Sequence, residues 1–155
     1  MPDPVPQDAQ ATDDGHRWHY RQRTGELLLG DQVVVHGYAG RGLGKNNPAM
    51  QNAHGIGPLP QGSYQIVGPP HPGGHMGPDV LYLCPALDNQ MFDRGGFYIH
   101  SDAIHDPGNA SEGCIVVDPP AFRWTIWNSG VRHLEVESGD PDPLPTPQQS
   151  ATPAA

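Results

Sequence analysis

The stretch FYIHSDAIHDPGNASEGCIVV, residues Phe97 to Val117, contains two short apolar runs separated by a polar loop. The first run ends in His100, thirteen residues follow, and Cys114 opens the second run directly after Gly113. Short apolar runs rich in β-branched and aromatic residues, bounded by Gly, Pro, Asn and Asp, are typical of β-strands. We therefore predict two strands, with a histidine at the end of one and a cysteine at the mouth of the other.

Similar runs recur along the chain, between its 20 glycines and 19 prolines. Thr24 and Gly25 separate the first two runs and predict a hairpin turn. Many short strands with turn signals between them predict a mainly β fold, a sandwich or a barrel. The expected strands are RWHYRQ, ELLLG, QVVVHGYA, SYQIVG, DVLYLCP, GGFYIHS, GCIVVD and RHLEVE.

One short helix is expected after the cysteine strand, over DPPAFRWTIWNSG. Asp118 is a suitable N-cap, Pro119 suits the first helical position and Gly130 suits the C′ position. Residues four apart share a face of a helix, and an apolar face packs on a sheet. The residues expected on that face are Phe122, Ile126 and Trp127.

The two ends of the chain differ in composition from its middle. Residues 1–15 are rich in Pro, Asp and Gln, and residues 138–155 are rich in Pro, Ser and Ala. Neither segment has enough apolar surface to offset the entropy lost on ordering, so we predict disordered arms at both ends. The remaining residues, 16–137, form the single predicted domain.

Charge and hydropathy restrict the partners. A net charge of −9 with only eight Lys and Arg argues against binding to nucleic acid or to an anionic membrane. The N-terminus lacks the basic and apolar regions of a signal peptide, and no apolar run approaches the ~20 residues that span a bilayer. We expect a chain made in the cytoplasm, without membrane insertion, that leaves the cell only by a route other than general export.

Cys114 and His100 together suggest nucleophilic catalysis. Cysteine attacks as a thiolate, so a catalytic cysteine needs a base beside it. His100 would be that base if its strand end lies beside the Cys114 strand, and the amides of Gly113 and Cys114 would then form an oxyanion hole. Either Asp102 or a backbone carbonyl near Ser101 would orient the imidazole.

The motif IHSD…ASEGCIV resembles the His-x-x … Ser-x-Gly-Cys signature of the YkuD-like L,D-transpeptidases. A wider pattern, GYAGRGLGKNNPAMQNAHGIGPLPQGSYQIV followed by FYIHSD, SEGCIVV and HLEV, resembles the type VI secretion L,D-transpeptidase effector family. The resemblance covers residues 18–136. It implies an L,D-transpeptidase-like fold without a cofactor, with Cys114 as nucleophile and His100 as base.

The same resemblance implies a substrate and partners. The peptidoglycan stem tetrapeptide would be attacked at the L-centre of diaminopimelate, with release of D-alanine or its exchange for a free D-amino acid. Delivery by secretion machinery into the periplasm of a target bacterium, and a cognate immunity protein, are also implied.

Three residues depart from the housekeeping transpeptidases that this motif resembles: Ser101 replaces a glycine, Glu112 a histidine and Val116 an arginine. Because that arginine is absent, another residue must bind the substrate carboxylate, and Arg94 and Arg41 are the two candidates. Residues expected to bind substrate are Asn46 and Asn47 in the long loop 37–62, Ser111 of the motif, and Arg94; the alternative for the two asparagines is capping of their own loop.

Other interpretations involve the remaining cysteine and histidines. Cys84 is expected in the core. Two alternatives are a disulfide between Cys84 and Cys114 and an NlpC-type peptidase site made of Cys84 and His100. No metal site is expected, because His71, His75 and His105 lie in loops that impose no coordination geometry. A non-catalytic peptidoglycan-binding module is the third alternative.

Overall fold

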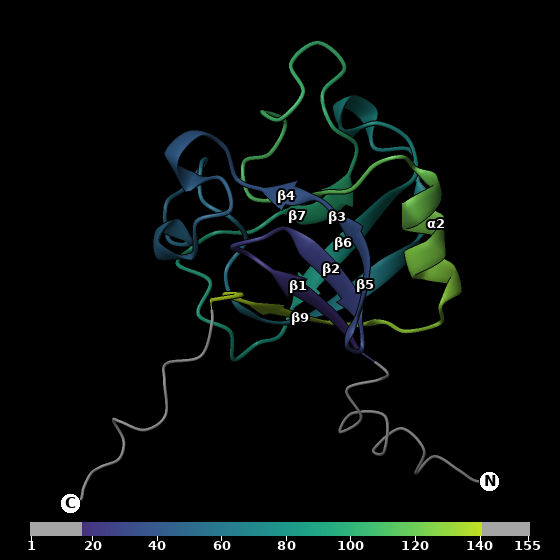
Figure 1. The fold of residues 1–155 in the computed structure, drawn as a ribbon, viewed down its shortest axis with the longest axis horizontal. Helices are drawn as coiled ribbons and strands as arrows, with labels where there is room; N and C mark the ends of the chain where they lie inside the picture. Colours follow the sequence, from purple (N-terminus) through teal and green to yellow (C-terminus); the bar gives the residue numbers. More distant parts are fainter. Residues whose placement is uncertain (1–16, 141–155) are drawn as a thin grey trace, which may run out of the picture.

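The computed structural model describes residues 17–140, so the predicted arm at 1–15 and nearly all of the arm at 138–155 lie outside the described residues. The described chain folds into a curved sheet with one α-helix against it (Figure 1). The strands are β1 (Trp18–Arg21), β2 (Glu26–Leu29), β3 (Gln32–His36), β4 (Tyr38–Ala39), β5 (Gly62–His71), β6 (Val80–Pro85), β7 (Phe97–His100), β8 (Ile115–Val116) and β9 (His133–Glu137). The helix is α2 (Ala121–Asn128), and three short 3-10 turns are η2 (Gly42–Gly44), η3 (Pro48–Met50) and η4 (Gly74–Met76).

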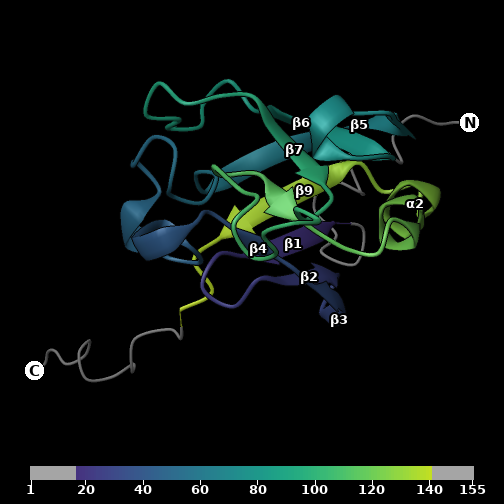
Figure 2. The same ribbon diagram turned by 90° about the horizontal axis from the view of Figure 1, so that it is seen from above.

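The sheet nearly closes on itself. Its strand order is β3-β2-β1-β9-β5-β6-β7-β8-β4, so β3 and β4 form opposite edges although only Gly37 separates them in the chain. Figure 2 shows β5, β6 and β7 on one side of the curled sheet and β1, β2 and β3 on the other. The mainly β, barrel-like prediction is confirmed.

Gly37 is where the chain passes from one edge of the sheet to the other. A Cβ atom at this position would lie 2.0 Å from the carbonyl oxygen of Val116, so only glycine allows β4 to reach β8. The run expected as one strand over residues 32–39 is therefore two strands. The predicted turn at Thr24 and Gly25 does join β1 to β2, which pair antiparallel.

The sheet's inner face and α2 enclose the core. Alternate residues of β6, β7 and β8 point inward, and Leu81, Ile99 and Ile115 are fully buried. Alternation then directs the intervening residues of β7 and β8 to the opposite face of the sheet. The other large buried side chains are Trp18, Tyr20, Leu27, Leu59, Ile66, Leu83, Ile126 and Leu134.

Helix α2 packs on the sheet as predicted but begins later. Ile126 is fully buried, with Phe122 and Trp127 packed against the core, and Gly130 has the left-handed φ of +78° expected at C′. The expected N-cap is wrong. Pro120 occupies that position without a side-chain cap, because the Asp118 carboxylate accepts hydrogen bonds from Asp102 and Arg123 instead. Within residues 17–140 no helix has the length and apolar character needed to cross a membrane.

Candidate active site

His100 ends β7, and Cys114 comes directly before β8, the parallel strand beside it. The register aligns Ile99 with Ile115 and His100 with Val116, which places Cys114, two residues before Val116, beside Tyr98. Strands ~4.8 Å apart with a rise of ~3.3 Å per residue bring the Cα atoms of Cys114 and His100 to about 8 Å. The two side chains therefore lie near enough to act on one substrate atom.

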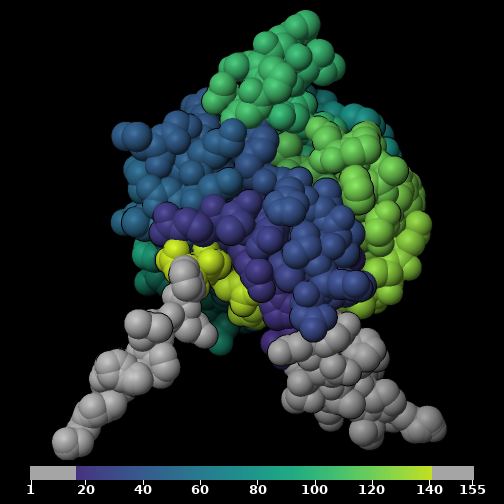
Figure 3. Space-filling view, in the orientation of Figure 1, coloured from purple at the N-terminus to yellow at the C-terminus, as the bar shows by residue number. Residues whose placement is uncertain are grey.

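Both residues line a cavity of about 700 Å³. The segment after β7 borders it and protrudes above the body of the molecule in Figure 3. His54, His75, Asp93 and Glu112 add polar and charged side chains to the wall. The remaining lining residues are Gly55, Met76, Arg94, Gly95, Gly96, Phe97, Tyr98, Ser101, Asp102, Ala103 and Ala110.

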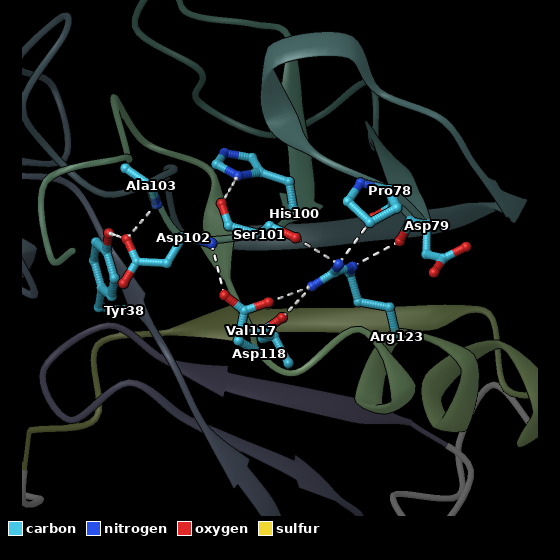
Figure 4. Close-up of polar contacts among 10 residues, drawn as sticks. All are labelled: Tyr38, Pro78, Asp79, His100, Ser101, Asp102, Ala103, Val117, Asp118 and Arg123. Carbon is cyan, nitrogen blue, oxygen red and sulfur yellow. Dashed lines mark hydrogen bonds and ion pairs between the residues drawn. The ribbon is translucent and has the colours of Figure 1, made fainter. Parts of the chain in front are cut away.

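His100 is oriented by its own strand end. Its Nδ1 lies 2.7 Å from the carbonyl oxygen of Ser101 (Figure 4), so the neutral ring carries its proton on Nδ1 and leaves Nε2 basic. Burial lowers the pKa of His100, and the positive charge of Arg123 and the nearby His75 lower it further. The imidazole is therefore neutral at pH 7 and able to accept a proton.

Asp102 does not contact the imidazole. Its carboxylate accepts hydrogen bonds from the Tyr38 hydroxyl at 2.6 Å and from the amides of Ala103 and Gly108. These bonds close the loop that follows β7. Of the two predicted orienting groups, the structure therefore pairs His100 with the Ser101 carbonyl and gives Asp102 a place in the loop.

Cys114 is a neutral thiol in the resting site. Burial raises its pKa to about 11, and the carboxylate of Glu112 acts in the same direction. The Tyr98 amide, which donates to Sγ at 3.3 Å, and Arg94 favour the thiolate but do not outweigh burial. An attack by Cys114 therefore requires a base to take the proton as the new bond forms.

Ser111 shapes the turn before Cys114. Its fully buried hydroxyl accepts from the amides of Gly40 and Gly113 and donates to the Cys114 carbonyl at 2.6 Å. These three bonds occupy the hydroxyl in the turn, and its contact with substrate stays a prediction. Gly113 and Cys114 are the two predicted oxyanion donors. The Gly113 amide donates to the Ser111 hydroxyl at 3.0 Å, whereas the Cys114 amide does not donate to Ser111.

Arg94 is a structural clamp that also lines the cavity, and its contact with substrate stays a prediction. Its four terminal N–H groups donate to the carbonyls of Gln51, Pro58, Gly57 and Glu112. A Cβ at Gly113 would lie 2.7 Å from this guanidinium, so the glycine before Cys114 makes room for the clamp. Burial lowers the pKa of Arg94, but the four carbonyls compensate its charge.

Arg41 remains the candidate partner for a substrate carboxylate. Its guanidinium lies 3.9 Å from the carboxylate of Glu112, which lines the cavity, and both side chains are largely exposed. An exposed ion pair of this length is weak, so a ligand carboxylate could replace Glu112 as the partner of Arg41.

Asn46 and Asn47 organise their own loop, as the capping alternative expects, and their contact with substrate stays a prediction. Asn46 has a left-handed φ of +52°, and its side-chain oxygen accepts a hydrogen bond from the Ala39 amide. The Asn47 side chain caps η3 through the Ala49 amide and donates to the Leu43 carbonyl. Neither asparagine is among the residues that line the cavity.

Cys84 is exposed in β6, so the expectation of a core residue is wrong. Alternation along β6 buries Leu83 and turns Cys84 outward. Its side chain borders a separate pocket beside Ser63, Gln65 and His133, away from His100, and both cysteines are free. The structure therefore supports neither the Cys84 peptidase site nor the disulfide.

The histidines form no cluster of metal ligands in the described part of the chain. Nowhere within residues 17–140 do three or more His, Cys, Asp or Glu side chains converge as such a cluster would. His75 and His100 do line one cavity, but His71 does not line it and His105 is exposed in the loop after β7.

Arg123 and Asp118 are site residues that the sequence interpretation missed. Arg123 is fully buried on α2, and its guanidinium reaches the Ser101 hydroxyl at 2.7 Å. A signal was present, because Arg123 lies three and four residues before Ile126 and Trp127 and therefore on the face expected to pack inward.

The fold and cavity define a mainly β domain with a cysteine nucleophile candidate and a neutral histidine on neighbouring strands. The Tlde1 domain model matches residues 33–137, from β3 to the end of β9. The chain belongs to the Tlde1 domain family, and the predicted resemblance is confirmed at the level of a type VI secretion effector family. The comparison with curated proteins gives no match.

Proposed function

We propose that this domain is a cysteine-dependent L,D-transpeptidase and L,D-carboxypeptidase that acts on peptidoglycan stem tetrapeptides. One observation carries the proposal: Cys114 and His100 line one cavity beside the parallel strands β7 and β8, and the Ser101 carbonyl leaves His100 Nε2 as the basic atom. Family membership is consistent with an effector directed at the cell wall.

The reaction begins with transfer of the thiol proton from Cys114 to Nε2 of His100. Sγ bonds to the amide carbonyl carbon at the L-centre of diaminopimelate, and the carbonyl π electrons move to the oxygen, which the Cys114 amide would stabilise. Collapse of this intermediate breaks the C–N bond, and the D-alanine amine leaves with the proton from His100. Because the resting thiol is neutral, proton transfer and attack are coupled.

The thioester on Cys114 then has two possible acceptors. Attack by water gives a tripeptide stem, and attack by the amine of a free D-amino acid gives an exchanged stem. The tripeptide lacks the terminal amide bond that a cross-linking enzyme would use, and the exchanged stem ends in a different D-amino acid. Either reaction would reduce the supply of usable donor stems, so the activity would be toxic in a periplasm. We accordingly propose secretion into a target bacterium and an immunity protein that blocks the cavity.

The test uses purified domain and tetrapeptide muropeptides, with and without an added D-amino acid, analysed by mass spectrometry. Wild type and Cys84→Ala should release D-alanine, whereas Cys114→Ala should lose at least about 10³-fold in turnover. Turnover by Cys114→Ala at the wild-type rate would contradict the proposal. Binding of wild-type protein to sacculi without any mass change would identify a non-catalytic module instead.

Toxicity is tested separately in cells. Domain directed to the periplasm by an added signal sequence should stop growth, and the Cys114→Ala variant at equal expression should not. Normal growth with wild-type protein, in cells that carry no neighbouring gene of the effector, would contradict an antibacterial role.

A further inference from the structure

A single buried guanidinium joins the ends of the two strands that carry the reactive pair. Arg123 donates to the carbonyls of Pro78 and Asp79, to the Val117 carbonyl after β8, and to the Ser101 hydroxyl after β7. Figure 4 shows these bonds converging on the guanidinium. Segments far apart in sequence thus meet at one charged group, next to the residue that follows His100.

Asp118 extends this connection to the imidazole through one peptide unit. Its carboxylate is 3.2 Å from Arg123 and accepts the Asp102 amide at 2.7 Å. The Ser101 carbonyl belongs to the same peptide unit and accepts from His100 Nδ1. A peptide unit is planar, so holding its N–H sets the direction of its C=O.

We propose that Asp118 and Arg123 are positioning residues that orient His100 through the peptide unit between Ser101 and Asp102. In a Ser-His-Asp triad, a carboxylate bonded directly to the histidine fixes the tautomer and orientation of the ring. The Asp118 carboxylate would fix both for His100 indirectly, through this peptide unit. Its bond to the Asp102 amide also strengthens the Ser101 carbonyl as an acceptor, because hydrogen bonds in a chain polarise one another.

Two further contacts hold Ser101, the residue that supplies the carbonyl of this peptide unit. The Ser101 amide donates to the Met76 carbonyl at 3.1 Å, and the Ser101 side chain lies against Gly77, where a Cβ would approach it to 2.8 Å. Ser101 is therefore held by η4 and by α2. A glycine at position 101 would lack the hydroxyl that Arg123 uses.

The effect of Asp118 on catalysis rests on the proposed function, but the orientation of the His100 imidazole does not. Long-range ¹H–¹⁵N correlation spectra of the imidazole give the His100 tautomer without substrate. Wild-type protein and Asp140→Asn, a control that removes a carboxylate from Arg23 at the far end of the domain, should both carry the proton on Nδ1. Asp118→Asn should show a mixture of the two tautomers.

Steady-state kinetics on muropeptides provide the second measurement. Asp118→Asn should lower kcat about 10- to 100-fold with KM within about 2-fold, since only the base is misplaced. Asp118→Glu should recover part of the loss, and Asp140→Asn should keep the wild-type kcat. If wild-type protein turns over no stem peptide, the proposed function fails while the tautomer result still decides the positioning.

Two results would overturn the inference. One is a wild-type His100 with its proton on Nε2, which needs no variant and so does not depend on variant folding. The other is an Asp118→Asn variant that keeps both the wild-type tautomer and a kcat within about 2-fold of wild type.

Discussion

The Ser111 hydroxyl donates to the carbonyl of Cys114, three residues later, while accepting the Gly113 amide that lies between them. This pair of bonds forms a tight turn at the entrance to β8. The position of the Cys114 thiol therefore depends on a serine that lies outside the cavity.

Ser111→Ala should destabilise the domain and slow catalysis. Its removal leaves the buried amides of Gly40 and Gly113 without a partner, at a cost of about 2–4 kcal/mol in the free energy of unfolding. Urea denaturation measures this cost, with Ser63→Ala, which removes a partly buried bond to Glu135 away from the site, as the matched control. Equal stability of the two variants would contradict the assigned contacts.

Arg41 and Arg94 should respond differently to mutation. Arg41→Ala removes an exposed group and should raise KM for tetrapeptide about 3- to 10-fold while changing the free energy of unfolding by less than about 1 kcal/mol. Arg94→Lys cannot serve four buried carbonyls and should cost about 2–4 kcal/mol in stability. An unchanged KM in Arg41→Ala would remove Arg41 as the carboxylate partner.

The Cys114 thiol should be alkylated slowly at neutral pH. Its pKa is raised to about 11, so the thiolate fraction and the rate with iodoacetamide should rise tenfold per pH unit and level off near pH 11. The Cys84→Ala background isolates this reaction from the exposed cysteine. A plateau already reached at pH 7 would reveal a resting thiolate and imidazolium, contrary to the neutral pair described above.

The same shift gives a stability prediction with a definite sign. The folded pKa of Cys114 lies above its unfolded value, so its contribution to stability is complete below pH ~8.5 and is lost as pH rises to about 11. The pH dependence of urea unfolding should therefore be shallower above pH 8.5 in Cys114→Ala than in wild type.

Gly37→Ala should prevent normal closure of the barrel. The added Cβ would lie 2.0 Å from the Val116 carbonyl oxygen, a backbone atom that cannot rotate away. We expect a loss of about 3 kcal/mol or more in the free energy of unfolding. Gly95→Ala, where a Cβ meets no atom within 4 Å, is the control, and equal stability of the two variants would contradict the strand order at this edge.

Local patterns in the sequence located the strands, apart from the break at Gly37, and led to the prediction of His100 and Cys114 as the reactive pair. Apolar alternation and turn residues located the strands, and strand-end positions selected His100 and Cys114. Long-range contacts decided the rest. Arg94 carries a group suited to a ligand, yet four backbone carbonyls distant in sequence accept its hydrogen bonds, and alternation along β6 turns Cys84 outward. Asp118 does not cap the helix, because its carboxylate accepts hydrogen bonds from the Asp102 amide and from Arg123.

The most direct test of the central claim is intact-protein mass spectrometry of the domain mixed rapidly with tetrapeptide stems and quenched in acid. The account predicts a covalent adduct with the mass of the stem minus D-alanine, located on Cys114 by peptide mapping and absent from Cys114→Ala. An adduct on Cys84, or D-alanine release by protein that never carries an adduct on Cys114, would contradict it.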